Sequence, residues 1–379
     1  MASGIAERLN VKEATARAAP LPLQARQGLD LKVGDWVVVR PALEILATLD
    51  QNACYENLPF MPQMYKYCGQ HLRVRKSAHK MCDTVNATGA RGMTGAVFLD
   101  DVLCDGAAFG GCEMACSIVW KEAWLRRIDD GAAVFNSNPE PRLEALAWSA
   151  SRAGTHPGTG ETIYSCQATR LPSATTHLPW WSVHQYVTDF KTGNIGLAPV
   201  LARVMSIVYA QLVSSGLGFG RPLRMLYDAV QRVRGEAPFP FHKGRVPAGV
   251  KTPTADLGLR EGELVRIKSV DQILETVDQN MFNRGMSFHA EFTPYCGKTF
   301  RVKQRVSKLI NEKTGRLATL KNSCIILDGV ICHGRFTQPI NCPRAMPPYW
   351  REIWLERVET GAVAHTDIDA SKPAAFGNS

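Results

Sequence analysis

The feature that most constrains this fold is an internal repeat. Tyr67-Cys68-Gly69 recurs as Tyr295-Cys296-Gly297, 228 positions further along a chain of 379 residues. At the same offset, Gly34, Asp50, Phe60, Arg73-Val74, Leu99-Asp100 and Cys104 match Gly262, Asp278, Phe288, Arg301-Val302, Leu327-Asp328 and Cys332. After a slip of two positions, Trp120, Glu122, Trp124-Leu125 and Arg127 match Trp350, Glu352, Trp354-Leu355 and Arg357. The chain therefore contains two copies of one cysteine-bearing module.

The repeat divides the chain into five parts. We expect a flexible leader at 1–30, a first copy at 31–128, a helical or irregular middle segment at 129–255, a second copy at 256–358 and a flexible tail at 359–379. The two copies and the middle segment suit the length of the chain, which is typical of two or three domains.

Within each copy, short apolar runs alternate with turns. Strands are predicted over 31–40, 72–75 and 96–100 and at the equivalent positions of the second copy, because these runs are rich in β-branched and aromatic residues. One short helical pattern follows the first strand, and both tryptophans near the end of each copy are expected on one face of a last strand. The predicted fold class is α+β, with two tandem small β-barrels of SH3-like character and a mainly helical middle segment.

The middle segment contains the most apolar stretch of the chain. Residues 197–217 approach the length of a membrane span, but Arg203 and Gln211 lie within them and Pro199 shortens them. A buried or interfacial helix is therefore favoured over a transmembrane one, and contact with a membrane surface or a partner protein is an open alternative. A second helix is predicted over 222–234.

Composition limits the classes of function. The net charge of +9 allows non-specific attraction to nucleic acid, but the basic residues are scattered, so a solvated surface is favoured over a nucleic-acid groove. The first thirty residues lack the apolar core of a secretion signal, which predicts a cytoplasmic location. In a reducing compartment, eleven cysteines indicate metal ligands or reactive thiols more often than disulfides.

The cysteines of each copy are numerous enough to close a four-ligand site. The candidate metal ligands are Cys296, Cys324, Cys332 and Cys342 in the second copy, and Cys68, Cys82, Cys104, Cys112 and Cys116 in the first. Three positions are equivalent, since Cys68, Cys104 and Cys112 match Cys296, Cys332 and Cys342. The fourth differs, because Ala96 stands where the second copy has Cys324, so that Cys82 or Cys116 would have to take its place.

Thiolate sulfur is a preferred ligand of zinc and of iron in clusters. Zinc is favoured over iron or an iron–sulfur cluster, since a small barrel gains stability from a metal that links its loops. Two alternatives stay open: ordinary buried thiols, and a redox-active pair or nucleophile.

Two further polar sets are weaker candidates. His289 and Glu291 would share one face of an extended segment, although a surface pair is the favoured interpretation. His177, His184 and Asp189 lie near Trp180-Trp181 in the sequence, where an aromatic-lined pocket or core tryptophans with incidental histidines are expected.

The motifs resemble those of a family of bacterial proteins with this three-part layout and no assigned activity. The resemblance is carried by Tyr-Cys-Gly in both copies, by Tyr349-Trp350-Arg351-Glu352-Ile353-Trp354-Leu355-Glu356-Arg357-Val358, and by Tyr164-Ser165-Cys166-Gln167-Ala168-Thr169 in the middle segment. It covers roughly residues 31–358 and implies the architecture, but no reaction.

Three functions are compatible with these features. The first is a cysteine-ligated metal-binding protein that serves as a binding or accessory component of a bacterial biosynthetic pathway, with a partner protein or homo-oligomer formed through the middle segment. The second is a redox enzyme with cysteine-ligated iron or an iron–sulfur centre. The third is a basic adaptor that binds nucleic acid.

Overall fold

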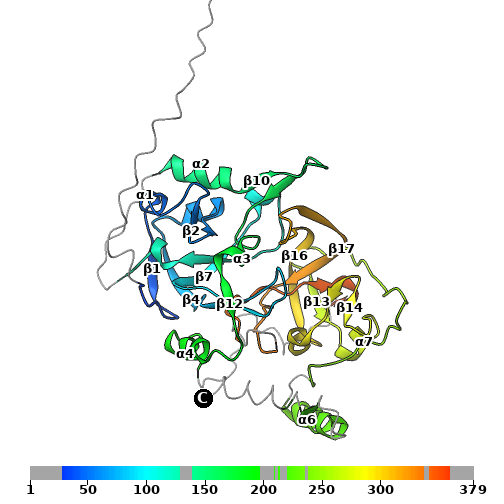
Figure 1. The fold of residues 1–379 in the computed structure, drawn as a ribbon. Helices are drawn as coiled ribbons and strands as arrows, with labels where there is room; N and C mark the ends of the chain where they lie inside the picture. Colours follow the sequence, from blue (N-terminus) through cyan, green and yellow to red (C-terminus); the bar gives the residue numbers. More distant parts are fainter. Residues whose placement is uncertain are drawn as a thin grey trace, which may run out of the picture.

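The computed structural model describes residues 28–128, 139–196, 209, 212–213, 220–234, 238–336 and 341–358. Its described part mixes helices and strands, with two five-stranded sheets as the main elements (Figure 1). Most of the predicted leader, all of the predicted tail and most of the predicted 197–217 helix lie outside the described residues. Among the described residues, no helix combines the length and apolar character needed to cross a bilayer.

The two sheets have the same strand order. The first contains β8 (Ser117–Lys121), β7 (Ala96–Leu103), β4 (His71–Ser77), β1 (Trp36–Val39) and β9 (Leu125–Arg127), in that order across the sheet. The second contains β18 (Trp350–Arg351), β17 (Leu317–Leu327), β16 (Thr299–Ile310), β13 (Leu264–Ile267) and β19 (Leu355–Arg357). Strands at opposite edges, such as β8 and β9, are adjacent in sequence, so each sheet is curled.

The register of pairing also repeats. Val37 pairs with Arg127 as Val265 pairs with Arg357, and Val97 pairs with Trp120 as Ile325 pairs with Trp350. These pairs keep the offsets found in the sequence. The repeated motifs therefore specify equivalent backbone positions in the two sheets.

The smaller elements between the strands are repeated as well. Each copy has a one-turn helix, a hairpin of two short strands and a 3₁₀ helix. In the first copy these are α1 (Ala42–Leu46), β2 (Cys54–Tyr55) with β3 (Leu58–Pro59), and η3 (Pro62–Tyr67). In the second copy they are α7 (Val270–Leu274), β14 (Phe282–Asn283) with β15 (Met286–Ser287), and η6 (Ala290–Tyr295). The predicted short helix after the first strand is thus confirmed.

The Tyr-Cys-Gly motif ends the 3₁₀ helix of each copy. Gly69 and Gly297 have φ angles of 79° and 80°, a left-handed conformation that a residue with a Cβ adopts only with strain. Their backbone N–H groups donate to Val39 and Ile267, at 2.9 Å in both copies. The glycine is therefore explained by a turn that returns the chain to the first strand of the sheet.

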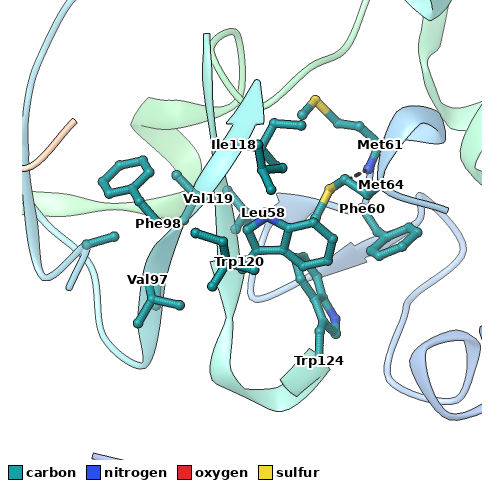
Figure 2. Close-up of a cluster of buried hydrophobic side chains, with 14 of the residues drawn as sticks. Leu58, Phe60, Met61, Met64, Val97, Phe98, Ile118, Val119, Trp120 and Trp124 are labelled. Carbon is teal, nitrogen blue, oxygen red and sulfur yellow. Dashed lines mark hydrogen bonds between the residues drawn. The ribbon is translucent and has the colours of Figure 1, made fainter. Parts of the chain in front are cut away.

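The paired tryptophans close each core. Trp120, Trp124, Trp350 and Trp354 are all fully buried, and a 3₁₀ turn, η5 (Glu122–Trp124) or η7 (Glu352–Trp354), interrupts the single last strand that the sequence predicted. Figure 2 shows Trp120 and Trp124 of the first copy against Phe60 and Met64. The Phe60 ring meets Trp124 edge-to-face at 5.4 Å, and Phe288 meets Trp354 at 5.4 Å. The turn places both indoles of a copy in its core while the chain crosses from one sheet edge to the other.

The two copies differ between their second and third long strands. In the second copy, β16 and β17 form one long hairpin that turns at 311–315. In the first copy, the connection contains β5 (Lys80–Cys82) and β6 (Ala90–Gly92), which form a separate three-stranded sheet with β12 (Thr176–Leu178) of the middle segment.

The middle segment has strands as well as helices. It contains α2 (Pro141–Ala150), β10 (Arg152–Thr155), β11 (Thr162–Tyr164), α3 (Leu171–Ala174), β12, α4 (Val183–Lys191) and the predicted helix α6 (Gly220–Arg234). Its strands were missed because they are short and gain their partners from distant residues, as β12 does from β6. Gln167 attaches the segment to the first sheet, because its amide exchanges hydrogen bonds of 2.8 and 2.9 Å with the backbone of Val119.

Candidate functional site: a buried thiol pair at the junction of the copies

The second copy reaches into the core of the first at a region we call the junction. It consists of Ile310 on the long hairpin and Cys342 and Arg344 on the loop before β18, together with the first-copy residues that they contact. Ile310 and Cys342 belong to the hydrophobic core of the first copy and are 2% and 7% exposed. The junction therefore joins the two copies through buried side chains rather than through a solvated interface.

The loops at the junction are built alike in the two copies. Cys104 donates its backbone N–H to Cys116, and Cys332 donates its own to Met346, at 2.8 Å in both cases. Gly106 and Gly334, two residues after these cysteines, have φ angles of 68° and 61°. A Cβ at Gly106 would lie 1.8 Å from the Cys112 carbonyl oxygen, and one at Gly334 would lie 2.5 Å from the Cys342 nitrogen. Glycine thus allows each loop to fold back against Cys112 or Cys342.

Cys112 and Cys342 make reciprocal contacts across the junction. The backbone N–H of Ile310 in the second copy donates to Cys112 Sγ at 3.4 Å. The Cys342 thiol of the second copy donates to Cys82 Sγ of the first copy at 3.7 Å. The equivalence of these two cysteines in sequence is therefore matched by equivalent roles at the junction, where Cys342 contacts the Cys82 thiol.

Arg344 lies beside this thiol pair and is only 5% exposed. Its guanidinium donates to Thr84 Oγ1 at 3.0 Å and lies 3.9 Å from Glu312 Oε1. Burial acts against its charge, but the nearby sulfur atoms of Cys82 and Cys116 raise the pKa of Arg344. A buried cation is thus held where a thiolate would neutralise it.

The pair is expected to share one proton. The hydrogen bond from Cys342 lowers the pKa of Cys82 to about 6, against the effect of burial, and Arg344 acts in the same direction. The same hydrogen bond and burial raise the pKa of Cys342. Near neutral pH, Cys82 is therefore the thiolate and Cys342 the thiol, an arrangement typical of reactive cysteines.

A cavity of about 30 Å³ lies next to Arg344. It is large enough for a single small molecule of about the size of water. Its lining includes four cysteines, namely Cys104, Cys112, Cys116 and Cys166. Burial raises the pKa of Cys104 to about 12 and raises those of the other three, so these thiols are neutral. Gln63 Nε2 also donates to Cys104 Sγ at 3.0 Å.

The remaining predicted ligands lie elsewhere in the two copies. Cys68 and Cys296 follow the 3₁₀ helices, and burial raises the pKa of both to about 12. Cys324 Sγ lies 3.5 Å from Met286 Sδ in a small separate core cluster. Cys332 is partly buried, and burial raises its pKa to about 12.

The structure does not assemble the predicted ligand sets. All eleven cysteines are described, and within the described ranges no three or more His, Cys, Asp and Glu side chains are arranged to hold a metal ion. Zinc or iron binding stays a prediction.

The other predicted polar sets are also separated. His289 is exposed, and its ring packs edge-to-face on the Phe292 ring. Glu291 is buried and accepts a hydrogen bond of 2.6 Å from the Phe336 backbone N–H. The segment is a 3₁₀ helix, so the shared face expected of an extended strand is absent. Trp180 and Trp181 are 62% and 66% exposed, which makes the expectation of core tryptophans wrong.

Asp189 has partners that sequence reasoning missed. It pairs with the fully buried Lys80 at 2.5 Å and lies 3.3 Å from His79 Nε2, while His79 Nδ1 lies 3.3 Å from Ser77 Oγ. The order serine, histidine, aspartate resembles a hydrolase triad, but Lys80 already neutralises Asp189. The network therefore anchors α4 to β4 and β5.

Cys166 and Arg344 were also absent from the predicted site. Arg344 follows Cys342-Pro343 in a proline-rich loop, and an arginine in such an apolar context was the one available signal.

No protein-family model matches the chain, and a search of curated proteins finds no match.

Proposed function

We propose that this protein is a thiol-based redox protein whose reactive pair is Cys82 and Cys342. The observation that carries the proposal is the 3.7 Å approach of two thiols next to a buried guanidinium. Thiol–disulfide exchange requires an attacking thiolate and a second thiol within reach to resolve the mixed disulfide. Cys82 is partly exposed and Cys342 is buried, so these roles fall to Cys82 and Cys342 respectively.

The proposed reaction uses a small-molecule disulfide as oxidant. The Cys82 thiolate attacks one sulfur of that disulfide, which forms a mixed disulfide and releases one thiolate. Cys342 then loses its proton and attacks Cys82 Sγ, which forms the Cys82–Cys342 disulfide and releases the second thiolate. The protein loses two electrons and one proton, and the small disulfide becomes two thiols once the released thiolates are protonated in solution.

The role of Arg344 in this scheme is electrostatic. Its guanidinium stabilises the Cys82 thiolate before attack, and it stabilises Cys82 again as the leaving group when the protein disulfide is reduced. The same charge is otherwise costly in this buried position, which accounts for an arginine in an apolar loop.

Glutathione disulfide added to the reduced full-length protein tests the proposal. The wild type should lose two electrons and one proton without retaining glutathione, whereas Cys342→Ser should accumulate the mixed disulfide on Cys82. Cys82→Ser should form neither product. Cys296→Ser, which alters a thiol whose pKa is about 12, is the matched control and should behave as the wild type. Retention of glutathione by a cysteine other than Cys82 would refute the assignment.

For the fold, we propose that each curled sheet is one SH3-like barrel. The support is the order of the five strands with a 3₁₀ turn before the last one, in both copies. An accessory role in a biosynthetic pathway stays a prediction.

A further inference from the structure

The junction gathers soft, polarisable atoms around a single buried positive charge. Cys82 and Cys342 approach within 3.7 Å, and Arg344 also interacts electrostatically with Cys116. Arg344 and Met81 line the same cavity. Sulfur donors of this kind select soft metal ions over hard ones such as Mg²⁺ or Ca²⁺.

The number of ligands at the junction favours a soft monovalent ion over zinc. A zinc ion between Cys82 and Cys342 would be two ligands short of the four that zinc takes in structural sites. Within the described part of the chain, no three or more His, Cys, Asp and Glu side chains are arranged to hold a metal ion. The charge at the junction does not decide between the two ions, because the Glu312 carboxylate already lies 3.9 Å from the Arg344 guanidinium.

The sulfur separation is close to that of a two-coordinate site. Metal–sulfur bonds are about 2.3 Å long, so two of them in line would hold the sulfur atoms about 4.6 Å apart. The observed 3.7 Å is about 0.9 Å shorter, so the two sulfur atoms would have to move apart by that amount when the ion binds.

We propose that Cys82 and Cys342 form a two-coordinate thiolate site for a soft monovalent cation, Cu(I) or an ion of the same chemistry, with the Arg344 guanidinium beside it. The site rests on the thiol pair of the proposed function but does not require that the pair cycle between thiol and disulfide. Bound cation and disulfide exclude each other, because both occupy the same sulfur atoms.

The probe is Cu(I) added under anaerobic conditions to the reduced full-length protein in competition with a chromophoric Cu(I) chelator. One equivalent should bind, and X-ray absorption should report two sulfur neighbours. Cys82→Ser and Cys342→Ser should each abolish this binding. Arg344→Gln should weaken it by about 10- to 100-fold, as expected for a group that supports a metal ligand, and Arg344→Lys should restore most of the loss. Cys296→Ser should bind as the wild type.

Three results would overturn the inference: no Cu(I) retained against the chelator, three or more sulfur neighbours, or binding that survives both single substitutions. Loss of binding in Cys104→Ser but not in Cys82→Ser would place the ion in the cavity and equally contradict it. The redox proposal fails separately, because a protein that binds Cu(I) but forms no Cys82–Cys342 disulfide refutes only the exchange reaction. A protein that forms the disulfide but binds no Cu(I) refutes only the metal site.

Discussion

The two copies share a five-stranded sheet with its short connecting elements, which we call the frame, and they differ in the segments inserted into it. In both, a buried tryptophan donates to a threonine hydroxyl, Trp124 to Thr48 at 3.1 Å and Trp354 to Thr276 at 2.9 Å. The first copy adds the β5 and β6 insertion, which contains Cys82, whereas the second adds the long hairpin. The repeated parts build the fold, and the thiol pair forms where a loop that both copies share, in the second copy, meets the insertion of the first.

The cysteines of the shared frame differ in pKa from the cysteine in the insertion of the first copy. Cys68 and Cys296 occupy equivalent positions, and burial raises the pKa of both to about 12. The pair with a thiolate combines Cys82, which has no counterpart in the second copy, with Cys342. The thiol pair therefore combines one repeated cysteine with one that only the first copy has.

Truncation of the core tryptophans should have the largest effect and should test the equivalence of the frames. Trp124→Ala and Trp354→Ala should each cost about 3–5 kcal/mol of unfolding free energy, because both indoles are fully buried. Urea denaturation followed by circular dichroism measures the loss. Trp180→Ala, at a site 62% exposed, is the control and should change stability by less than about 0.5 kcal/mol. A loss at only one of the two buried positions would break the equivalence.

Alkylation rates should separate the repeated cysteines from the junction pair. The pKa of Cys82 is lowered to about 6 and that of Cys68 is raised to about 12, so at pH 7 the first is mostly thiolate and the second almost entirely thiol. After allowance for the weaker nucleophilicity of an acidic thiol, iodoacetamide should label Cys82 about a hundredfold faster. The Cys82 rate should rise with pH through about 6 and then level off, since only the thiolate reacts. Equal rates by peptide mass spectrometry would contradict this.

Removal of the buried Arg344 guanidinium should raise the pKa of Cys82 toward the pKa of Cys68 and Cys296. Arg344→Gln removes a charge that favours the Cys82 thiolate, so the midpoint of the alkylation profile should move up and the rate at pH 6 should fall roughly fivefold. Arg344→Lys should keep most of the wild-type rate. An unchanged midpoint in the glutamine variant would show that the hydrogen bond from Cys342 accounts for the low pKa alone.

The contact between the hairpin turn and the middle segment should matter least. Arg316 and Glu161 pair on the surface, so Arg316→Gln should cost about 0–1 kcal/mol, and less at high salt. Thermal unfolding at two salt concentrations measures the change. A loss as large as that of a core tryptophan would mean that this contact, rather than the buried junction, holds the copies together.

The sequence predicted much of the frame because the frame is local and duplicated. The offsets of Tyr-Cys-Gly and of the final tryptophans became the strand registers of both sheets. The 3₁₀ turn between Trp120 and Trp124 was missed, since a strand with two tryptophans on one face predicts the same spacing.

The junction could not be predicted in the same way. Cys82 and Cys342 are 260 positions apart and occupy different copies. The predicted ligand sets were drawn from one copy at a time, so they could not pair these two cysteines. Arg344 was missed because its partners are contributed by distant segments, and Asp189 was placed near histidines in sequence rather than with Lys80. Contacts between non-equivalent parts of a repeat leave no signal in the repeat itself.

The most direct test of the account is to oxidise the reduced protein with one equivalent of disulfide, digest it without reductant and identify the linked peptides. We expect one dominant product, in which the peptide containing Cys82 is joined to the peptide containing Cys342. A dominant link between equivalent cysteines, or oxidation spread evenly over the cysteines that line the cavity, would contradict it.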